Sequence, residues 1–131
     1  MKFLIAEDDP SGILLLKMIL TEYGDVDDVA DGRAAIEAFE RASAKGAPYD
    51  AIFLDIMMPD LNGHEVLRTI RERERRMRLP QIRQTKVIMT TALDSADNVN
   101  QAFYEGRASA YLVKPILRTA VLQEMKKLGL L

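Results

Sequence analysis

The chain has 131 residues, no cysteine and a nearly balanced charge, with 20 acidic and 18 basic residues and a formal net charge of −2. A length of roughly 100 to 150 residues is typical of one domain, so we expect a single domain over residues 1–131, and the lack of cysteine excludes a disulfide framework or a thiolate zinc site. No apolar run reaches the ~20 residues of a membrane helix, and the apolar start is too short for a secretory signal, so we expect a cytoplasmic protein. The net charge does not favour binding of nucleic acid by bulk charge.

The first half of the chain predicts two pairs of a strand and a helix. The apolar run at residues 3–6 predicts a buried strand, and a helix follows it whose apolar residues recur at helical spacing until Gly24. A weaker strand candidate covers residues 26–30, and the next helix is expected over residues 32–45. The expected N-caps of the two helices are Asp9 and Asp31.

Three further pairs are expected in the second half. Short apolar runs predict strands at residues 51–54, 87–89 and 110–113, as in a parallel sheet buried on both faces. Amphipathic stretches predict helices at residues 62–77, 96–106 and 117–128. This alternation is typical of an α/β fold in which helices cover both faces of a parallel sheet.

The residues that follow four of the five expected strands are mostly polar. They are Glu7, Asp8 and Asp9 after the first, Asp55 after the third, Thr90, Thr91 and Ala92 after the fourth, and Lys114 and Pro115 after the fifth. Ligands of an open parallel sheet bind beyond the carboxyl ends of the strands, so we expect these residues to share one edge. Crowded carboxylates favour Mg²⁺, a lysine and a threonine can contact phosphate oxygens, and a carboxylate can form an acyl phosphate. The combination indicates phosphoryl transfer to an aspartate.

At these residues the sequence resembles the receiver domains of two-component response regulators, of the single-domain chemotaxis-regulator type. Five segments carry the resemblance in the family's order: FLIAEDD (3–9), ADGRAA (30–35), FLDIMMPDLNG (53–63), MTTA (89–92) and YLVKP (111–115). The resemblance implies a flavodoxin-like doubly wound (βα)5 sandwich with a five-stranded parallel sheet in the order 2-1-3-4-5. It also implies a signalling domain that catalyses only its own phosphorylation and dephosphorylation.

The resemblance assigns roles to the acidic residues. Asp55 would accept a phosphoryl group from the phosphohistidine of a histidine kinase or a histidine phosphotransfer protein. A Mg²⁺ ion would be held by Asp8, by Asp55 and by the backbone carbonyl of Met57, with Glu7 acting through a water. The family thus implies one cofactor, Mg²⁺, at the carboxyl edge of the sheet.

The remaining site roles fall on the fourth and fifth strands. Lys114, the Thr91 hydroxyl and the Ala92 amide would contact the phosphoryl group. Tyr111 would move inward as Thr91 shifts, and this two-state change would alter the surface that binds a downstream protein or relays the phosphoryl group. The domain would therefore signal through protein contacts.

The first helix has more apolar surface than its buried stripe requires. Ile13, Leu14 and Met18 lie off that stripe and beside the acidic residues, so we expect them to form a docking patch for the kinase.

The segment from residue 68 to residue 86 is rich in arginine. It has eight basic residues against Glu72 and Glu74, and we interpret it as a solvated helix face that continues into an exposed loop. Asp55 and Thr91 are 36 residues apart, a wider spacing than is usual for the family. This spacing places an insertion at residues 77–85, for which we expect an acidic partner.

Other interpretations stay open. His64, the only histidine, is expected to be exposed at a helix start. A haloacid-dehalogenase-type phosphatase would need an aspartate two residues after Asp55, where Met57 stands, and an interaction domain that needs no phosphorylation is also disfavoured. The chain could also be the receiver portion of a longer regulator. We expect a monomer or weak dimer with no membrane or direct nucleic acid partner.

Overall fold

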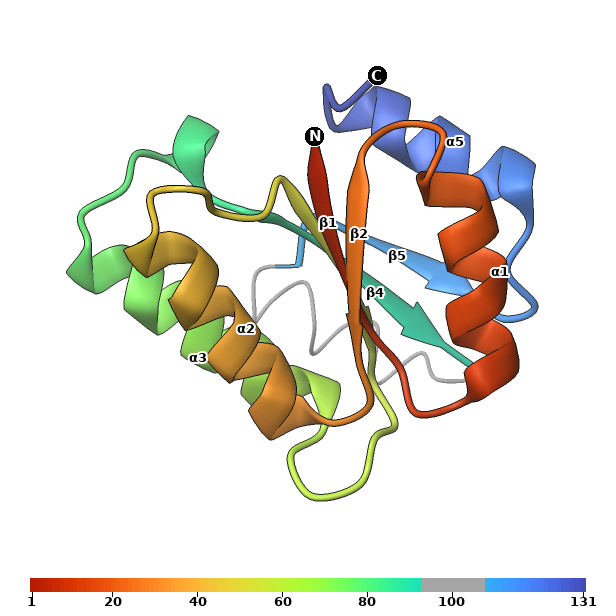
Figure 1. The fold of residues 1–131 in the computed structure, drawn as a ribbon, viewed down its shortest axis with the longest axis horizontal. Coiled ribbons are helices and arrows are strands. Elements are labelled where there is room, and N and C mark those ends of the chain that lie inside the picture. Colours follow the sequence, from red (N-terminus) through yellow and green to blue (C-terminus); the bar gives the residue numbers. More distant parts are fainter. Residues whose placement is uncertain (93–107) are drawn as a thin grey trace.

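Five parallel strands form one sheet in the computed structural model, which describes residues 1–92 and 108–131 (Figure 1). The strands are β1 (Lys2–Ala6), β2 (Asp25–Val29), β3 (Ala51–Asp55), β4 (Lys86–Thr91) and β5 (Ala110–Val113). Their order is β2-β1-β3-β4-β5, and every neighbouring pair is parallel. The predicted doubly wound fold and its strand order are therefore confirmed.

Helices cover both faces of the sheet. In Figure 1, α1 (Pro10–Leu20) and α5 (Arg118–Lys127) lie on one side, and α2 (Gly32–Ala44) and α3 (Gly63–Arg76) lie on the other. A short 3-10 helix, η1 (Gln81–Arg83), lies between α3 and β4. The helix predicted at residues 96–106 falls outside the described residues. Within the described parts of the chain, no helix is both long and apolar enough to cross a membrane.

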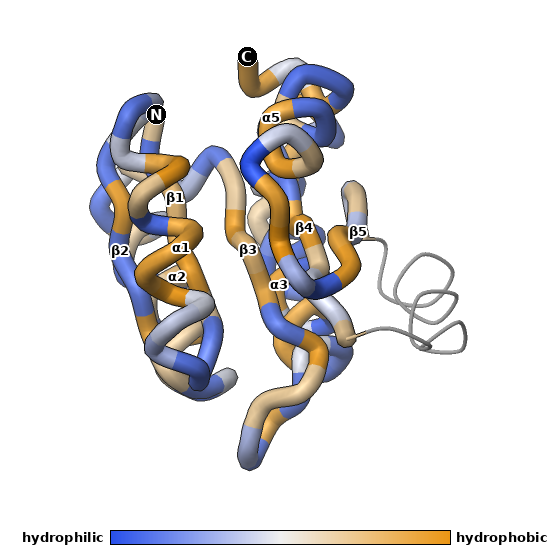
Figure 2. Tube along the Cα trace, turned by 90° about the vertical axis from the view of Figure 1, so that its right-hand side faces the viewer, coloured by the Kyte–Doolittle hydropathy of each residue, from blue (hydrophilic) through white to orange (hydrophobic). Residues whose placement is uncertain are grey.

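The sheet separates two apolar cores, because successive side chains of a strand point to opposite faces. On β1, Leu4 and Ala6 pack with α2 and α3, whereas Phe3 and Ile5 pack with α1 and α5. Strand β3 continues this alternation and is buried along its whole length. Its tube in Figure 2 is apolar between polar residues at its two ends. Asp55 therefore sits at the end of the most deeply buried strand.

The two outer strands are less buried than the central ones. On β2, Asp25, Asp27 and Asp28 are exposed. On β5, Ala110 and Leu112 are buried, but Tyr111 and Val113 are 38% and 41% exposed. The expectation of a strand buried on both faces is therefore wrong for β5. Its residues are apolar on both faces, but only the face of Ala110 and Leu112 is buried.

Side chains cap the amino ends of α1, α2 and α3, and the predicted caps Asp9 and Asp31 are confirmed. Asp9 accepts a hydrogen bond from the Ser11 amide at 3.2 Å, and Asp31 accepts one from the Ala34 amide at 2.8 Å. Helix α3 begins with a reciprocal capping box, because Asn62 accepts from the Glu65 amide and the Glu65 carboxylate accepts from the Asn62 amide. These caps fix the chain directions at the ends of β1, β2 and the loop after β3.

The predicted role of Gly24 as the end of the first helix is wrong. Helix α1 ends at Leu20, and the chain then turns so that the Asp25 amide donates to the Met1 carbonyl at 2.9 Å. A Cβ at residue 24 would lie 2.2 Å from that Met1 oxygen. Glycine is therefore required by the close approach of two backbone segments.

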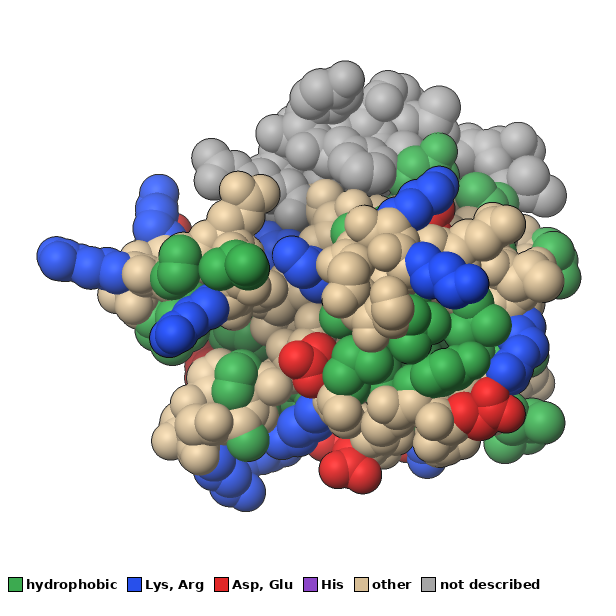
Figure 3. Space-filling model, turned by 90° about the horizontal axis from the view of Figure 1, so that it is seen from above, with side chains coloured by type: hydrophobic (Ala, Val, Ile, Leu, Met, Phe, Trp, Pro, Cys, Tyr) green, Lys and Arg blue, Asp and Glu red, His purple; other side chains and the backbone are tan. Residues whose placement is uncertain are grey.

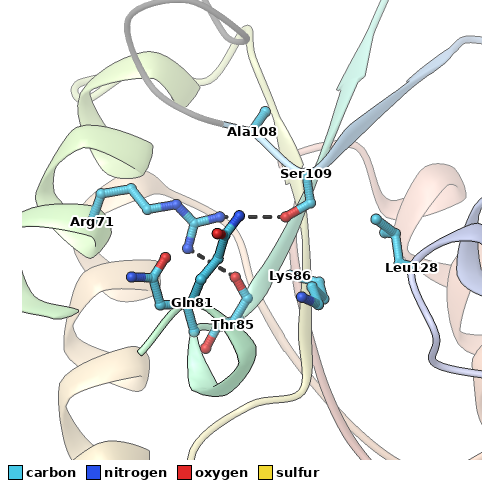
Figure 4. Close-up of a pocket in the computed structure, with 8 residues that line it drawn as sticks. Arg71, Gln81, Thr85, Lys86, Ala108, Ser109 and Leu128 are labelled. Atoms are coloured by element: carbon cyan, nitrogen blue, oxygen red, sulfur yellow. Dashed lines mark hydrogen bonds between the residues drawn. The ribbon is translucent and has the colours of Figure 1, made fainter. Parts of the chain in front are cut away.

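The arginine-rich segment is only partly a solvated face. The Glu74 side chain is buried, with 1% of its surface exposed; it accepts from the Arg71 guanidinium at 2.6 Å and from the Thr85 amide at 2.6 Å. Arg71 also donates to the Thr85 carbonyl and to the Ser109 hydroxyl, as Figure 4 shows beside a hollow of about 710 Å³. This network fastens the segment from residue 77 to residue 85, the α3–β4 connection, onto the sheet.

Candidate functional site

The predicted acidic residues meet at the carboxyl edge of the sheet. Carboxylate oxygens of Glu7, Asp8 and Asp55 all lie within 4.8 Å of one another. Glu7 and Asp55 are each 3% exposed, whereas Asp8 faces solvent. Lys114, just beyond β5, places its ammonium 2.7 Å from a Glu7 oxygen and 3.4 Å from an Asp55 oxygen. Three chain segments that are far apart in the sequence thus build one charged cluster.

Backbone hydrogen bonds hold the first acidic residues in place. The Glu7 amide continues the pairing of β1 with β2 by donating to the Val29 carbonyl at 3.1 Å. The Glu7 carboxylate accepts from the amides of Asp8 and Asp9, at 3.1 and 3.3 Å. The chain therefore turns around the Glu7 side chain and leaves the Asp8 side chain at the open side of the cluster.

The loop after β3 is held equally closely. Asp55 accepts from the Met57 amide at 3.2 Å, and the Gly63 amide donates to the Ile56 carbonyl at 2.8 Å. A Cβ at residue 63 would lie 2.6 Å from the Asp55 carbonyl oxygen and 2.7 Å from the Ile56 Cα. Glycine at this position therefore lets the start of α3 lie directly against the backbone of the central aspartate.

The pKa values of the cluster depend on burial and on the close charges. Burial, followed by the hydrogen bond and the charge of Glu7, raises the pKa of Asp55 to about 7. Burial would also raise the pKa of Glu7, but hydrogen bonds to Asp55 and Lys114 lower it below the ordinary value. Burial opposes the charge of Lys114, yet both carboxylates raise the pKa of its ammonium. Without a cation, one proton is therefore held on Asp55 up to near-neutral pH.

An oxygen-ligand cation fits this cluster. Three carboxylates next to one ammonium leave an excess of negative charge, and Asp55 gains a proton because that charge is not fully neutralised. Magnesium prefers oxygen ligands, binds through one or two carboxylates and keeps several waters. Buried Glu7 and Asp55 supply carboxylate oxygens, and exposed Asp8 lies on the side that is open to the waters that Mg²⁺ keeps.

The other predicted site residues lie around this cluster. Thr91 ends β4 with 1% of its surface exposed, and its hydroxyl donates to the Ala92 carbonyl at 3.1 Å. The Lys114 amide donates to the Thr91 carbonyl at 2.7 Å, and a cis peptide bond joins Lys114 to Pro115. Tyr111 lies on the strand next to Thr91 and is 38% exposed. The side chain of Met57 is 66% exposed beside Asp55.

The exposed apolar face of α1 differs by one residue from the expected docking patch. Leu14 and Met18 are 61% and 65% exposed, but Ile13 is half-buried and packs against the core between the sheet and α1 and α5. Leu15 is 39% exposed. The exposed apolar face therefore comprises Leu14, Leu15 and Met18, one residue displaced from the expected set, because α1 is rotated slightly relative to the stripe read from spacing.

One expectation about the start of α3 is wrong, and one residue there was missed. His64 is buried, with 4% of its surface exposed, rather than exposed as predicted. Its neighbour Gly63 lies directly against the backbone at the end of β3. Sequence reasoning also did not identify Gly63 as part of the site, although an Asn-Gly pair eight residues after a strand-end aspartate was a visible signal.

Comparisons with known proteins agree with this geometry. The sequence matches the family model of the response regulator receiver domain over residues 3–126. It is 37% identical over 98% of its length to the hybrid signal transduction histidine kinase L of Dictyostelium discoideum, and 40% identical over 87% of its length to the transcriptional regulatory protein TcrA of Mycobacterium tuberculosis. The matched region covers only 7% of the first relative and 40% of the second.

Solved structures of receiver domains share the fold. The receiver domain of a sensor histidine kinase from Pseudomonas aeruginosa, with a magnesium ion coordinated in its active site cleft, aligns with a TM-score of 0.76 and 28% identity over 98% of this chain and 97% of that one. The chemotaxis protein CheY4 of Vibrio cholerae aligns with a TM-score of 0.76 and 26% identity, over 97% of each chain.

Proposed function

Because this chain belongs to the family of response regulator receiver domains, we propose that it accepts a phosphoryl group on the carboxylate of Asp55, with Mg²⁺ bound beside it. The observation that carries the proposal is the placement of the Lys114 ammonium between Glu7 and Asp55 in a group of three carboxylates within 4.8 Å. Such a group combines a nucleophile, a cation site and a positive charge for phosphate oxygens.

The proposed donor is a phosphohistidine on a kinase or a phosphotransfer protein. An Asp55 oxygen attacks the phosphorus as the bond from phosphorus to the imidazole nitrogen breaks, and that nitrogen keeps the electron pair and takes up a proton. The proton on Asp55 has to leave first, since a protonated carboxyl is a poor nucleophile. Mg²⁺ would be held by Asp8, Asp55 and the Met57 carbonyl, with Glu7 acting through a water. The ion would neutralise the negative charge of the deprotonated Asp55 carboxylate and that of the phosphoryl oxygens.

After transfer, contacts to the phosphoryl group would bias the domain toward its active conformation. Lys114 is the proposed cationic contact, and the Thr91 hydroxyl and the Ala92 amide are the proposed hydrogen-bond donors. In the structure the Thr91 hydroxyl donates to the Ala92 carbonyl, a bond that it would have to give up for a phosphate oxygen. Tyr111 on the adjacent strand is the proposed partner in this change.

The output of the signal is also a proposal. The chain spans less than half of the hybrid kinase and of the transcriptional regulator that it resembles, so the activities of those proteins are not carried over as a whole. We propose that Leu14 and Met18 contact the histidine donor and that the activated domain binds a protein or passes its phosphoryl group on. A phosphatase of the haloacid-dehalogenase type is not favoured, because Met57 stands where that family needs an aspartate.

Reaction with acetyl phosphate tests the central proposal. We expect Mg²⁺-dependent addition of one phosphoryl group to the wild-type chain, measured by intact mass, and no addition to Asp55→Asn. Asp60→Asn is the matched control, because Asp60 is an exposed aspartate of the same loop. Equal addition to Asp55→Asn and to the wild type would contradict the assignment.

A further inference from the structure

A second concave surface lies at the amino ends of the strands, at the opposite edge from Asp55. This amino-edge groove has a volume of about 680 Å³ and is lined by three segments: residues 46–50, 79–86 and 128–130. Its apolar lining comes from Pro48, Tyr49, Leu79, Ile82, Leu128 and Leu130. Figure 3, which looks down on this edge, shows hydrophobic side chains gathered there and basic side chains projecting on the side of α3.

The α3–β4 connection forms one wall of the groove and is held in a defined shape. The Leu79 amide donates to the Glu74 carbonyl at 3.2 Å, and the Gln84 side chain donates to the Leu79 carbonyl at 3.4 Å. Buried Glu74 then anchors the Thr85 amide at 2.6 Å. Despite this support, Ile82 is 86% exposed, more than any other large apolar side chain of the described residues. The fold therefore presents an isoleucine to solvent on an ordered segment.

The groove is bordered by positive charge. Residues 75–86 include five basic residues and no acidic one. Arg75 and Arg76 pair with Glu72, but no ion pair within residues 1–92 and 108–131 includes Arg78, Arg83 or Lys86. Arg83 and Lys86 line the groove, where Asp50 is the one acidic residue among its lining. An exposed apolar centre with uncompensated cations at its rim is complementary to a ligand that is both apolar and acidic.

We propose that the amino-edge groove binds an acidic, amphipathic segment of a partner protein. Leucine or phenylalanine side chains of the segment would fill the space between Ile82 and Leu130, and its carboxylates would pair with Arg78, Arg83 and Lys86. Nucleic acid fits less well, since phosphates leave the apolar lining uncovered. A second copy of this chain also fits less well, because a two-fold interface through this groove would bring the same cations of both copies together.

Binding at this groove leaves the proposed phosphorylation site free. Asp50 at the groove and Asp55 at the carboxyl edge lie at opposite ends of β3, and five residues of extended chain span about 16 Å. A partner seated on Ile82 and Arg83 would not cover the carboxylates, Lys114 or the exposed face of α1. The groove would thus recruit a partner whether or not Asp55 carries a phosphoryl group.

Fluorescence anisotropy with a synthetic probe tests the proposal. The probe is a fluorescein-labelled 16-residue peptide with leucine or phenylalanine at every third or fourth position and glutamate elsewhere. The full chain is expected to bind it, Arg78→Glu/Arg83→Glu to lower the affinity at least tenfold, and Ile82→Ser to lower it several-fold. Arg33→Glu and Leu117→Ser are the matched controls, since both residues are exposed and belong neither to the groove lining nor to the α3–β4 connection, which contains Arg78.

Each alternative has its own result. The proposal would be supported if the affinity of the wild type for the peptide falls with rising salt and that of Arg78→Glu/Arg83→Glu depends less on salt. Equal affinity of the wild type and the groove variants, or equal affinity for a lysine-substituted peptide, would overturn it. Tighter binding of a 20-base-pair DNA duplex, or a dimer in sedimentation that Ile82→Ser abolishes, would replace it by nucleic acid binding or self-association. Reaction of the groove variants with acetyl phosphate is expected to match the wild type, which separates this proposal from that for Asp55.

Discussion

Lys114 forms its shorter ion pair with Glu7, because the ammonium lies 2.7 Å from Glu7 and 3.4 Å from Asp55. Glu7 therefore holds the lysine near the proposed nucleophile without itself being the residue that accepts the phosphoryl group. It also contributes one of the three carboxylates of the proposed cation site. A substitution of Glu7 would therefore disturb both the position of Lys114 and the charge of the acidic cluster.

Glu7→Gln should weaken Mg²⁺ binding. The substitution removes one negative charge from the cluster, and we expect the affinity for Mg²⁺ to fall about tenfold, measured by titration calorimetry at pH 7.5. Lys114 would then pair with Asp55 alone and hold its carboxylate more tightly. Asp9→Asn is the matched control, because Asp9 is an exposed helix cap whose role an asparagine can fill. Unchanged Mg²⁺ affinity in Glu7→Gln would remove Glu7 from the cation site.

The raised pKa of Asp55 predicts a dependence of stability on pH in the absence of metal. Its ordinary value is 3.8 and its value in the folded chain is about 7, so the native state binds the proton more tightly than the unfolded state. The resulting stabilisation is present at low pH and is lost as the pH rises from about 4 to about 7. Asparagine does not titrate, so Asp55→Asn should escape this loss.

Thermal unfolding in EDTA measures the effect. One pKa unit corresponds to about 1.4 kcal/mol, and allowing for solvent screening we expect Asp55→Asn to be on the order of 1 to 2 kcal/mol more stable than the wild type at pH 8. The difference in Tm should be a few degrees at pH 8 and should shrink at pH 5. Excess Mg²⁺ should stabilise the wild type more than the variant. A difference in Tm that does not change between pH 5 and pH 8 would contradict the pKa assignment.

Glu74 should be far more important for stability than its neighbour Glu72. Glu74→Ala leaves the Arg71 charge without its closest carboxylate and the buried Thr85 amide without its acceptor, so we expect a loss of about 3 kcal/mol in the free energy of unfolding. Glu72→Ala, which breaks only surface ion pairs with Arg75 and Arg76, should cost less than ~0.5 kcal/mol. Urea unfolding with an unchanged m-value would measure both. Similar losses in the two variants would mean that the buried network adds little.

Leu14→Asp separates docking from chemistry. Since Leu14 is 61% exposed, the substitution should leave stability within ~0.5 kcal/mol of the wild type. Reaction with acetyl phosphate needs no docked protein and should be unchanged, whereas transfer from the cognate phosphohistidine protein should slow at least tenfold. Ile82→Asp, at the opposite edge, is the matched control. Equal transfer rates for Leu14→Asp and the wild type would exclude a docking role for this face of α1.

Local patterns were sufficient to predict the alternation of strands and helices and the residues of the acidic cluster, whereas the strand order followed from the resemblance to the receiver family. Strand-end carboxylates and capping residues act over a few residues, so Glu7, Asp55 and the Asp31 cap can be recognised from the sequence. Burial that depends on distant segments could not be predicted in this way. Glu74 is buried because Thr85 and Arg71 meet it, and within an arginine-rich helix its charge looks like that of any exposed glutamate. His64 is likewise buried at the start of α3, beside a Gly63 that lies against the β3 backbone, and spacing alone reveals neither feature.

Small rotations of an element were equally hard to predict. The stripe of α1 was read from ideal helical spacing, and the structure moves its boundary by one residue, so that Ile13 is partly covered and Leu15 partly uncovered. Apolar residues cover enough of α1 that several rotations satisfy the pattern about equally well. The packing of Leu16, Ile19 and Leu20 against the sheet selects one of them.

The aspartates of β2 have a consequence for how the protein behaves at high concentration. A parallel sheet that ends in an open strand offers unpaired amides and carbonyls to any other chain, and such edges are a common start of aggregation. Asp25, Asp27 and Asp28 place three exposed carboxylates on this strand. A second copy aligned along the same edge would set these charges against one another. The strand with the weakest apolar pattern therefore protects the open edge of the sheet from pairing with a strand of another copy.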